Sequence, residues 1–162
     1  MRSSESRSSR APGRHLLHTH EPAGYDCPFC DFPTEREPEV VHRDERVFAI
    51  IAPRWWPRNA GHVLIIPVAH HENLYGLPAA DGHAVFDVTQ RLARAMRTAY
   101  GCAGVSTRQH NEPAGNQDVW HFHQHLFPRY PGDDLYDTLP APDWLPADRR
   151  HAYAERLRDA LT

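Results

Sequence analysis

The chain has 162 residues, a hydrophobic fraction of 40%, a charged fraction of 24% and a formal net charge of −3 at pH 7. This is the composition of a globular protein with enough residues for one domain with its own core. The chain provides neither the broad basic surface of a nucleic-acid-binding protein nor an apolar run of about 18 residues, so we expect no nucleic acid and no membrane as partner.

The N-terminal part of the chain differs in composition from the rest. Residues 1–24 are rich in Ser and Arg and lack the apolar core of a secretory signal, which predicts a disordered tail and a cytoplasmic protein. The folded domain is therefore expected over residues 25–162. It begins near Cys27 and Cys30, a C-x-x-C pair that in a cytoplasmic protein is more often metal-binding or redox-active than part of a disulfide scaffold.

Apolar periodicity predicts the elements that follow. Residues 40–51 predict a strand, a polar turn and a second strand, and residues 63–66 and 105–110 predict two further strands. Residues 79–100 carry apolar side chains at spacings of three and four, which predicts a long helix that ends at Gly101. Pro146 suits the first turn of a C-terminal helix that runs to Leu161. These elements predict an α+β domain with an antiparallel sheet of about five strands.

The last predicted strand, Trp120–Arg129, carries His121, His123 and His125 at every second position. Side chains alternate between the two faces of a strand, so the three imidazoles are expected to share one face. They could hold a metal, or they could do chemistry on an anion near neutral pH. A neutral imidazole can attack phosphorus and then leave. The preceding loop offers amide groups suited to phosphate oxygens.

Two segments resemble the histidine-triad (HIT) superfamily, and specifically its zinc-containing bacterial-type members. They are Gly61-His62-Val63-Leu64-Ile65-Ile66-Pro67 and Gln117-Asp118-Val119-Trp120-His121-Phe122-His123-Gln124-His125-Leu126-Phe127-Pro128-Arg129. The second is similar to the family motif His-φ-His-φ-His-φ-φ, where φ is apolar. The resemblance implies a HIT-like fold, a homodimer and a nucleotide substrate. It also implies a nucleotidyl hydrolase or transferase that releases a nucleoside monophosphate through a covalent nucleotidyl-histidine intermediate.

Carried over by position, the resemblance assigns roles to individual residues. His123 would be the nucleophile, and His125 would bond the phosphate or the leaving-group oxygen. The implied substrate-binding residues are Asn111, Gln117, Asp118 and His62, although His62 is equally well explained as a hydrogen-bonded core histidine. The substrate would be a dinucleoside polyphosphate or a nucleoside phosphoramidate. The alternative is a non-catalytic nucleotide-binding sensor or interaction module with the same fold.

The C-x-x-C pair has the spacing of half a structural zinc site. The resemblance implies one structural zinc per chain, held by Cys27, Cys30, His70 and His121. His71 and His42 are alternatives for the third ligand, and a reduced or redox-active cysteine pair is the alternative to a metal. If the triad itself held the zinc, the metal would instead be catalytic.

Several positions depart from the family pattern. Ala52 stands where the family has an aspartate that binds ribose, and Asp118 replaces a serine or threonine beside the phosphate. A carboxylate there would repel an anionic substrate when it is ionised. It could instead face His125 or an arginine, or act on a protonated amine leaving group. Gln124 replaces an apolar residue and needs a polar partner. Trp55 and Trp56 could stack on a base, or they could fill the core or a dimer interface. We prefer the core or the dimer interface to base stacking.

Overall fold

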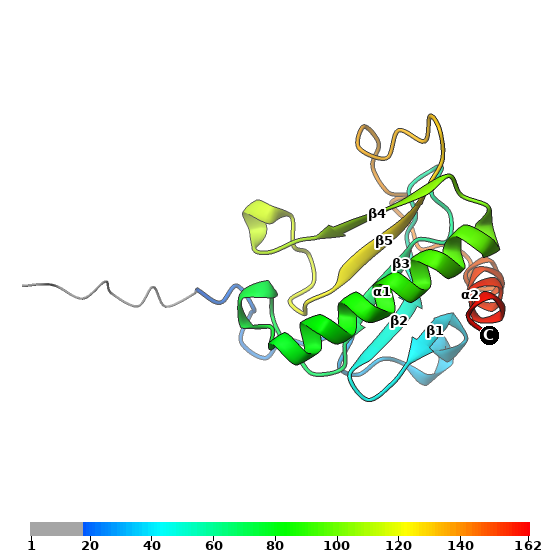
Figure 1. Ribbon diagram of the computed structural model, residues 1–162. Helices are drawn as coiled ribbons and strands as arrows, with labels where there is room; N and C mark the ends of the chain where they lie inside the picture. The colour runs from blue at the N-terminus through cyan, green and yellow to red at the C-terminus, as the bar shows by residue number, and fades with distance from the viewer. Residues whose placement is uncertain (1–17) are drawn as a thin grey trace, which may run out of the picture.

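The computed structural model of the chain describes residues 18–162 (Figure 1). The elements in chain order are η1 (Thr34–Glu39), β1 (Val40–Arg43), β2 (Val47–Ile51), β3 (Val63–Pro67), η2 (Leu74–Gly76), α1 (Ala79–Tyr100), β4 (Gly104–Gln109), η3 (Pro113–Gly115), β5 (Gln124–Arg129) and α2 (Ala147–Leu161), where η denotes a short 3-10 helix. The five strands form one antiparallel sheet in the order β1-β2-β3-β5-β4. The predicted α+β fold is confirmed.

Helix α1 crosses one face of the sheet, as Figure 1 shows. It buries the predicted apolar stripe, which includes Val85, Leu92 and Met96. The helix ends at Gly101, whose φ of 65° is left-handed and whose N–H donates to the carbonyl of Arg97. A residue without a side chain adopts this conformation at little cost, so glycine is the usual residue at such a helix end.

The strand register decides which side chains face α1. Leu64 lies opposite Ile50 on β2 and opposite His125 on β5, so these three side chains share one face of the sheet. The neighbouring residue, Gln124, faces the helix and donates a hydrogen bond of 2.9 Å to Thr89 on α1. Gln124 therefore has the polar partner that its position requires, and His125 projects from the face that α1 leaves uncovered.

Strand β5 is shorter than predicted, because it begins at Gln124 and leaves His121 and His123 in the extended segment before it. The backbone of this segment bonds to other partners instead of a neighbouring strand. The N–H of Phe122 donates to the carbonyl of His71, and the carbonyl of His121 accepts from the ring of His123. The expectation of three histidines within one regular strand is therefore wrong for two of them.

Helix α2 packs against α1 and β1, and it begins directly after Pro146, as predicted. Its Tyr153 makes edge-to-face contacts with Trp55 and with Tyr100 of α1, and both tyrosines lie against Gly61. Gly61 has a φ of 82°, and a Cβ there would lie 2.7 Å from the Tyr100 ring. Only glycine allows the two tyrosine rings to pack this closely against the backbone. The contact joins both helices to the start of β3.

The predicted tail, residues 1–24, lies partly outside the described residues. Residues 18–24 are described, and they contact the domain although the sequence placed them in the tail. The hydroxyl of Thr19 donates to Glu72 at 2.6 Å, and His20 stacks on Trp120. Over residues 18–162, the structure shows no helix with the length and apolar character needed to cross a membrane.

Candidate functional site

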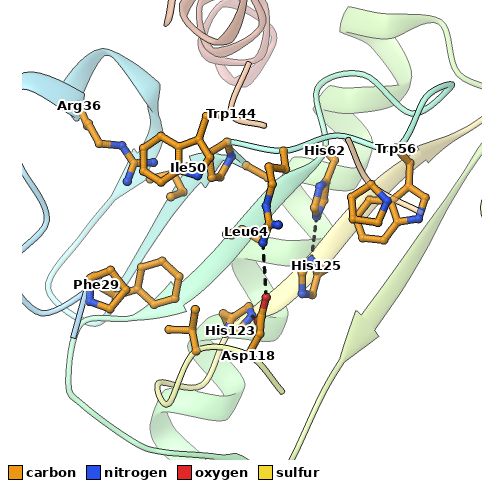
Figure 2. A pocket seen from close by; sticks show the side chains of 16 residues that line it. Phe29, Arg36, Ile50, Trp56, His62, Leu64, Asp118, His123, His125 and Trp144 are labelled. Atoms are coloured by element: carbon orange, nitrogen blue, oxygen red, sulfur yellow. Dashed lines mark hydrogen bonds and ion pairs between the residues drawn. The ribbon is translucent and has the colours of Figure 1, made fainter. Parts of the chain in front are cut away.

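The uncovered face of the sheet carries a cavity of about 220 Å³. Its floor is formed by Ile50, Leu64 and His125, the three side chains that the register places together. Figure 2 shows the cavity with His123 and Asp118 on one side and Trp56 on another. Trp144, from the segment before α2, also lines it. The cavity therefore brings strand residues together with two loops and the C-terminal segment.

His123 is held with one ring nitrogen toward this cavity. Its Nδ1 lies 2.8 Å from the backbone carbonyl of His121, which can only accept, so Nδ1 carries the proton. The other nitrogen, Nε2, is then free of a proton and lies 3.9 Å from the carboxylate of Asp118. Burial lowers the pKa of His123. The arrangement presents a neutral imidazole with its lone pair available for attack.

His125 is paired with His62 beneath the cavity (Figure 2). Nε2 of His62 and Nδ1 of His125 lie 2.8 Å apart, and the rings stack. Burial lowers the pKa of His62 to about 3 and holds the pKa of His125 well below its usual value. Two neutral rings can share this bond, because one donates and the other accepts. His62 thus lines the cavity and also fixes the ring of His125.

The two neighbouring tryptophans, Trp55 and Trp56, have different roles. Trp55 is buried against α2 and donates to the carbonyl of Ala52, so it belongs to the core. Trp56 lines the cavity, and its ring N–H donates to the carbonyl of Thr138 at 3.0 Å. The same loop accepts backbone hydrogen bonds from Ala141 and Leu145. The segment before α2 is thereby attached along the loop and becomes a wall of the cavity.

Gln117 and Asn111 do not line the cavity. The amide of Gln117 donates to the backbone carbonyls of Glu72 and Val119, and its oxygen accepts from the N–H of Glu112 at 2.9 Å. The oxygen of Asn111 accepts from the backbone N–H of Leu74 at 2.8 Å. Both side chains are occupied in holding the loop between β4 and β5. This loop carries Asp118, so the two residues position the site without facing it.

Cys27, Cys30, His70 and His121 form a second cluster, although they come from three distant segments. Their ligand atoms all lie within 4.8 Å of one another. The Sγ of Cys27 is 3.3 Å from Nδ1 of His121, and the Sγ of Cys30 is 3.2 Å from Nδ1 of His70. Two sulfurs and two nitrogens arranged in this way fit a tetrahedral metal ion.

The remaining ring nitrogens of this cluster are also occupied. Nε2 of His121 donates to the carbonyl of Pro67 at 2.9 Å, and Nε2 of His70 lies 2.7 Å from the carboxylate of Glu21. Each bond leaves the Nδ1 of its ring facing the sulfurs. The two alternative ligands lie elsewhere, since His71 pairs with Asp81 and His42 with Asp44. His121 is the one triad histidine in the cluster.

Residues 34–132 match the model of the HIT domain family. The chain belongs to the HIT domain family. Protein hit of Bacillus subtilis is 30% identical over 143 residues, which cover 82% of this chain and 94% of that protein. A zinc-bound histidine triad family protein from Mycobacterium smegmatis has a structure that superposes with a TM-score of 0.69 at 31% identity, covering 83% of this chain and 92% of that one.

A more distant HIT relative has a named activity. The bis(5'-adenosyl)-triphosphatase of Saccharomyces cerevisiae strain YJM789 is 28% identical over 106 residues, and the match covers 62% of this chain and 50% of that protein. In the present HIT domain Ala52 is buried and brings no polar side chain to the cavity that it lines.

Two arginines at positions outside the sequence motifs also line the cavity. Arg36 is bonded to Glu39 and packs between the rings of Phe32 and Trp144. Arg54 lies 3.8 Å from the carboxylate of Asp118. No motif marks these positions, because a lone arginine is usually a solvated surface residue. Both arginines reach the cavity of the HIT domain because segments that are distant in the sequence meet in the folded chain.

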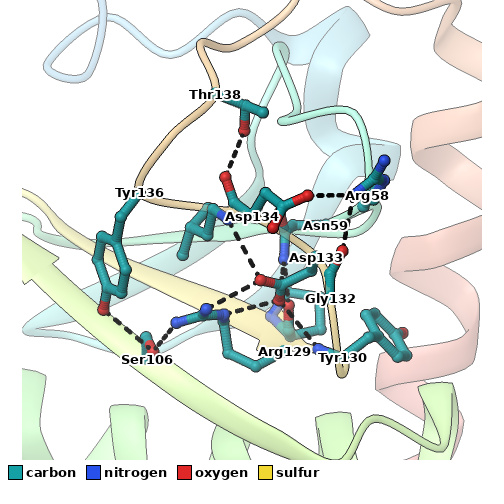
Figure 3. Close-up of polar contacts among 12 residues, drawn as sticks. Arg58, Asn59, Ser106, Arg129, Tyr130, Gly132, Asp133, Asp134, Tyr136 and Thr138 are labelled. Atoms are coloured by element: carbon teal, nitrogen blue, oxygen red, sulfur yellow. Dashed lines mark hydrogen bonds and ion pairs between the residues drawn. The ribbon is translucent and has the colours of Figure 1, made fainter.

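A buried aspartate supports the outer wall of the cavity (Figure 3). Asp133 is 3% exposed and accepts hydrogen bonds from the guanidinium of Arg129 and the amide of Asn59. Arg129 holds the pKa of Asp133 well below its usual value. This network fixes the turn after β5, from which Thr138 reaches Trp56. The HIT domain thus uses an ion pair to hold the loop that shapes its cavity.

Proposed function

We propose that this HIT protein is a nucleotidyl hydrolase or transferase that acts through His123. The observation that carries the proposal is the hydrogen bond from Nδ1 of His123 to the carbonyl of His121, which turns an unprotonated Nε2 toward the cavity. Membership of the HIT family supports the assignment, as does the similarity to the yeast bis(5'-adenosyl)-triphosphatase.

The reaction has two steps. In the first, Nε2 of His123 attacks the α-phosphorus of a nucleotide, a P–N bond forms, and the bond from phosphorus to the leaving group breaks. The leaving group keeps the electron pair and takes a proton from solvent. In the second, water or another acceptor attacks the phosphorus and gives a proton to solvent, the P–N bond to His123 breaks with its electron pair returning to Nε2, and a nucleoside monophosphate or its ester is released.

The other residues of the site support this chemistry from defined positions. His125 bonds an oxygen of the phosphate or of the leaving group, because it lies beside His123 with ring centroids 5.0 Å apart. His62 acts through its bond to His125. Gln117 and Asn111 act by holding the loop that carries Asp118. The substrate is a dinucleoside polyphosphate or a nucleoside phosphoramidate.

We propose further that Cys27, Cys30, His70 and His121 hold one structural zinc per chain. Thiolate and imidazole ligands are those that zinc prefers, and the zinc-bound Mycobacterium smegmatis protein is a relative over most of the chain. When bound, the metal supplies a crosslink between the N-terminal segment and the triad. The homodimer and the cytoplasmic location stay predictions from the resemblance.

A nucleotide sensor without turnover is the second candidate function. Ala52 and Asp118 favour it. The carboxylate of Asp118 lies 3.9 Å from Nε2 of His123 and so opposes the close approach of a phosphate to that nitrogen, which attack requires and binding does not. The intact triad favours the enzyme, because binding alone does not require a nucleophile with a free lone pair.

Product analysis by liquid chromatography tests the proposal. Purified protein is mixed with dinucleoside polyphosphates, nucleoside phosphoramidates and nucleotide sugars, alongside His123→Ala and His83→Ala. His83 is an exposed histidine of α1 and serves as the matched control. We expect a nucleoside monophosphate from the wild type and from His83→Ala, and none from His123→Ala, which should still bind nucleotide. Turnover by His123→Ala would reject the nucleophile, and no turnover by the wild type would favour the sensor.

A further inference from the structure

The mouth of the cavity holds two opposite charges that are loosely paired. Asp118 has 65% of its side chain exposed, and one carboxylate oxygen lies 3.8 Å from the guanidinium of Arg54. The other oxygen lies 3.9 Å from Nε2 of His123. Both distances exceed those of a hydrogen bond, so neither contact fixes the carboxylate. Among the described residues that line the cavity, Asp118 is the one acidic side chain.

The two arginines of the cavity differ in their freedom. Arg36 bonds Glu39 through two nitrogens and packs between two aromatic rings, and 14% of its side chain is exposed. Arg54 makes the long ion pair with Asp118 alone, and 44% of its side chain is exposed. An exposed ion pair of this kind contributes little to stability. A phosphate entering the cavity can therefore take Arg54 from Asp118 at little cost.

We propose that Arg54 and Asp118 set the charge selectivity of this pocket. Arg54 binds the phosphate that His123 attacks, and Asp118 repels leaving groups that carry further phosphates. The preferred substrate class is then a nucleotide conjugate with one phosphate and a neutral or amine leaving group. This inference rests on the proposed function, since it assigns the leaving-group side of the same site.

Asp118 discriminates between leaving groups through its charge. An atom attached to a phosphorus that His123 can attack lies within a few ångströms of this carboxylate. A second phosphate placed there adds negative charge next to negative charge, whereas an amine nitrogen offers N–H groups that the carboxylate can accept. At a separation of roughly 6 Å, one extra charge corresponds to about a threefold change in affinity in bulk water and about a hundredfold change at the effective dielectric constant of a protein surface. For this exposed carboxylate we take about tenfold, between these two limits, as the expected change.

The chain contains a matched control pair. Arg58 lies on the same loop as Arg54 and forms an ion pair with Asp134, whose side chain is 54% exposed (Figure 3). Neither residue lines the cavity. Asp134→Asn and Arg58→Gln thus repeat the charge changes of Asp118→Asn and Arg54→Gln away from the site. Asparagine also tolerates the left-handed backbone of Asp134, which has a φ of 50°.

Binding of AMP and ATP, measured by calorimetry at low salt without added magnesium, tests the inference. We expect Asp118→Asn to raise the affinity for ATP about tenfold and that for AMP about threefold or less, with no change in Asp134→Asn. We expect Arg54→Gln to lower both affinities about tenfold, with no change in Arg58→Gln. Equal effects of Asp118→Asn on both nucleotides, or no binding by any form, would overturn the inference.

The two proposals fail in different ways. A wild type that turns over no substrate but shows this binding pattern would reject the hydrolase and keep the charge selectivity. A wild type that turns over dinucleoside polyphosphates faster than phosphoramidates, with a ratio unchanged in Asp118→Asn, would keep the hydrolase and reject the charge selectivity.

Discussion

The backbone carbonyl of His121 accepts the hydrogen bond of the His123 ring at 2.8 Å, while the His121 ring faces the sulfur of Cys27 at 3.3 Å. One residue therefore belongs to both the proposed metal site and the proposed active site. Its ring orientation and its carbonyl orientation are fixed together, because both depend on the same backbone segment. Substitution of the cysteines should therefore alter the orientation of the His123 ring, although no cysteine lines the cavity.

The first prediction concerns metal content. We expect about one zinc per wild-type chain and none in Cys27→Ser/Cys30→Ser, because two of the four ligands are removed. Loss of a metal that crosslinks distant segments should lower the melting temperature by roughly 10 °C. Plasma mass spectrometry and thermal unfolding measure the two effects. Cys102→Ser is the control, since Cys102 is buried outside the cluster. Unchanged metal content in the double variant would exclude these ligands.

The second prediction concerns Glu21, whose carboxylate holds Nε2 of His70 at 2.7 Å. Carboxylates that orient a metal-binding histidine typically contribute about tenfold or more to metal affinity. We therefore expect Glu21→Gln to lose zinc to a competing chelator at an about tenfold lower chelator concentration. Glu45→Gln, in the exposed turn between β1 and β2, should match the wild type. If both variants retain zinc equally well, Glu21 does not support the site.

The third prediction concerns the bond between Gln124 and Thr89 that joins β5 to α1. Thr89→Val should lower the free energy of unfolding by about 1–3 kcal/mol, because the Gln124 amide loses its partner in a partly buried position. Thr89→Val/Gln124→Leu should recover most of this loss, since neither polar group then lacks a partner. Urea unfolding of both variants and of Gln124→Leu alone measures the coupling. Additive losses in the double variant would show that the bond is not the reason for Gln124.

The fourth prediction is a pH dependence of stability that originates at Asp133. Its pKa is held well below the usual value by Arg129, so its contribution is present above the unfolded-state value near about 4 and is lost as the pH falls. Asp133→Asn should be less stable by about 2 kcal/mol at pH 7. The difference from the wild type should shrink below about pH 4.

Urea unfolding between pH 3 and pH 7 checks this dependence. Asp137→Asn removes an exposed carboxylate nearby in the sequence and should leave the curve unchanged. A stability difference for Asp133→Asn that stays constant over the whole range would show that the Asp133 charge is not its source.

The sequence by itself determined the features that depend on local spacing. The apolar stripe of residues 79–100 specifies helix α1, and Gly101 ends it, because both follow from helix periodicity and backbone freedom. The triad spacing and the Gly61–Pro67 segment indicated the HIT family, which the family match then showed. The C-x-x-C pair indicated a metal site for the same local reason.

Only the tertiary structure decided which groups face the cavity and which support it. Gln117 turns to the backbone around it, β5 begins three residues after His121, and Arg54 meets Asp118 from a loop 64 positions earlier in the chain. Each outcome depends on where hydrogen-bond partners lie after folding, and those partners come from distant segments. Local spacing carries no information about such partners, because the packing of α1, α2 and the loops on the sheet brings them together.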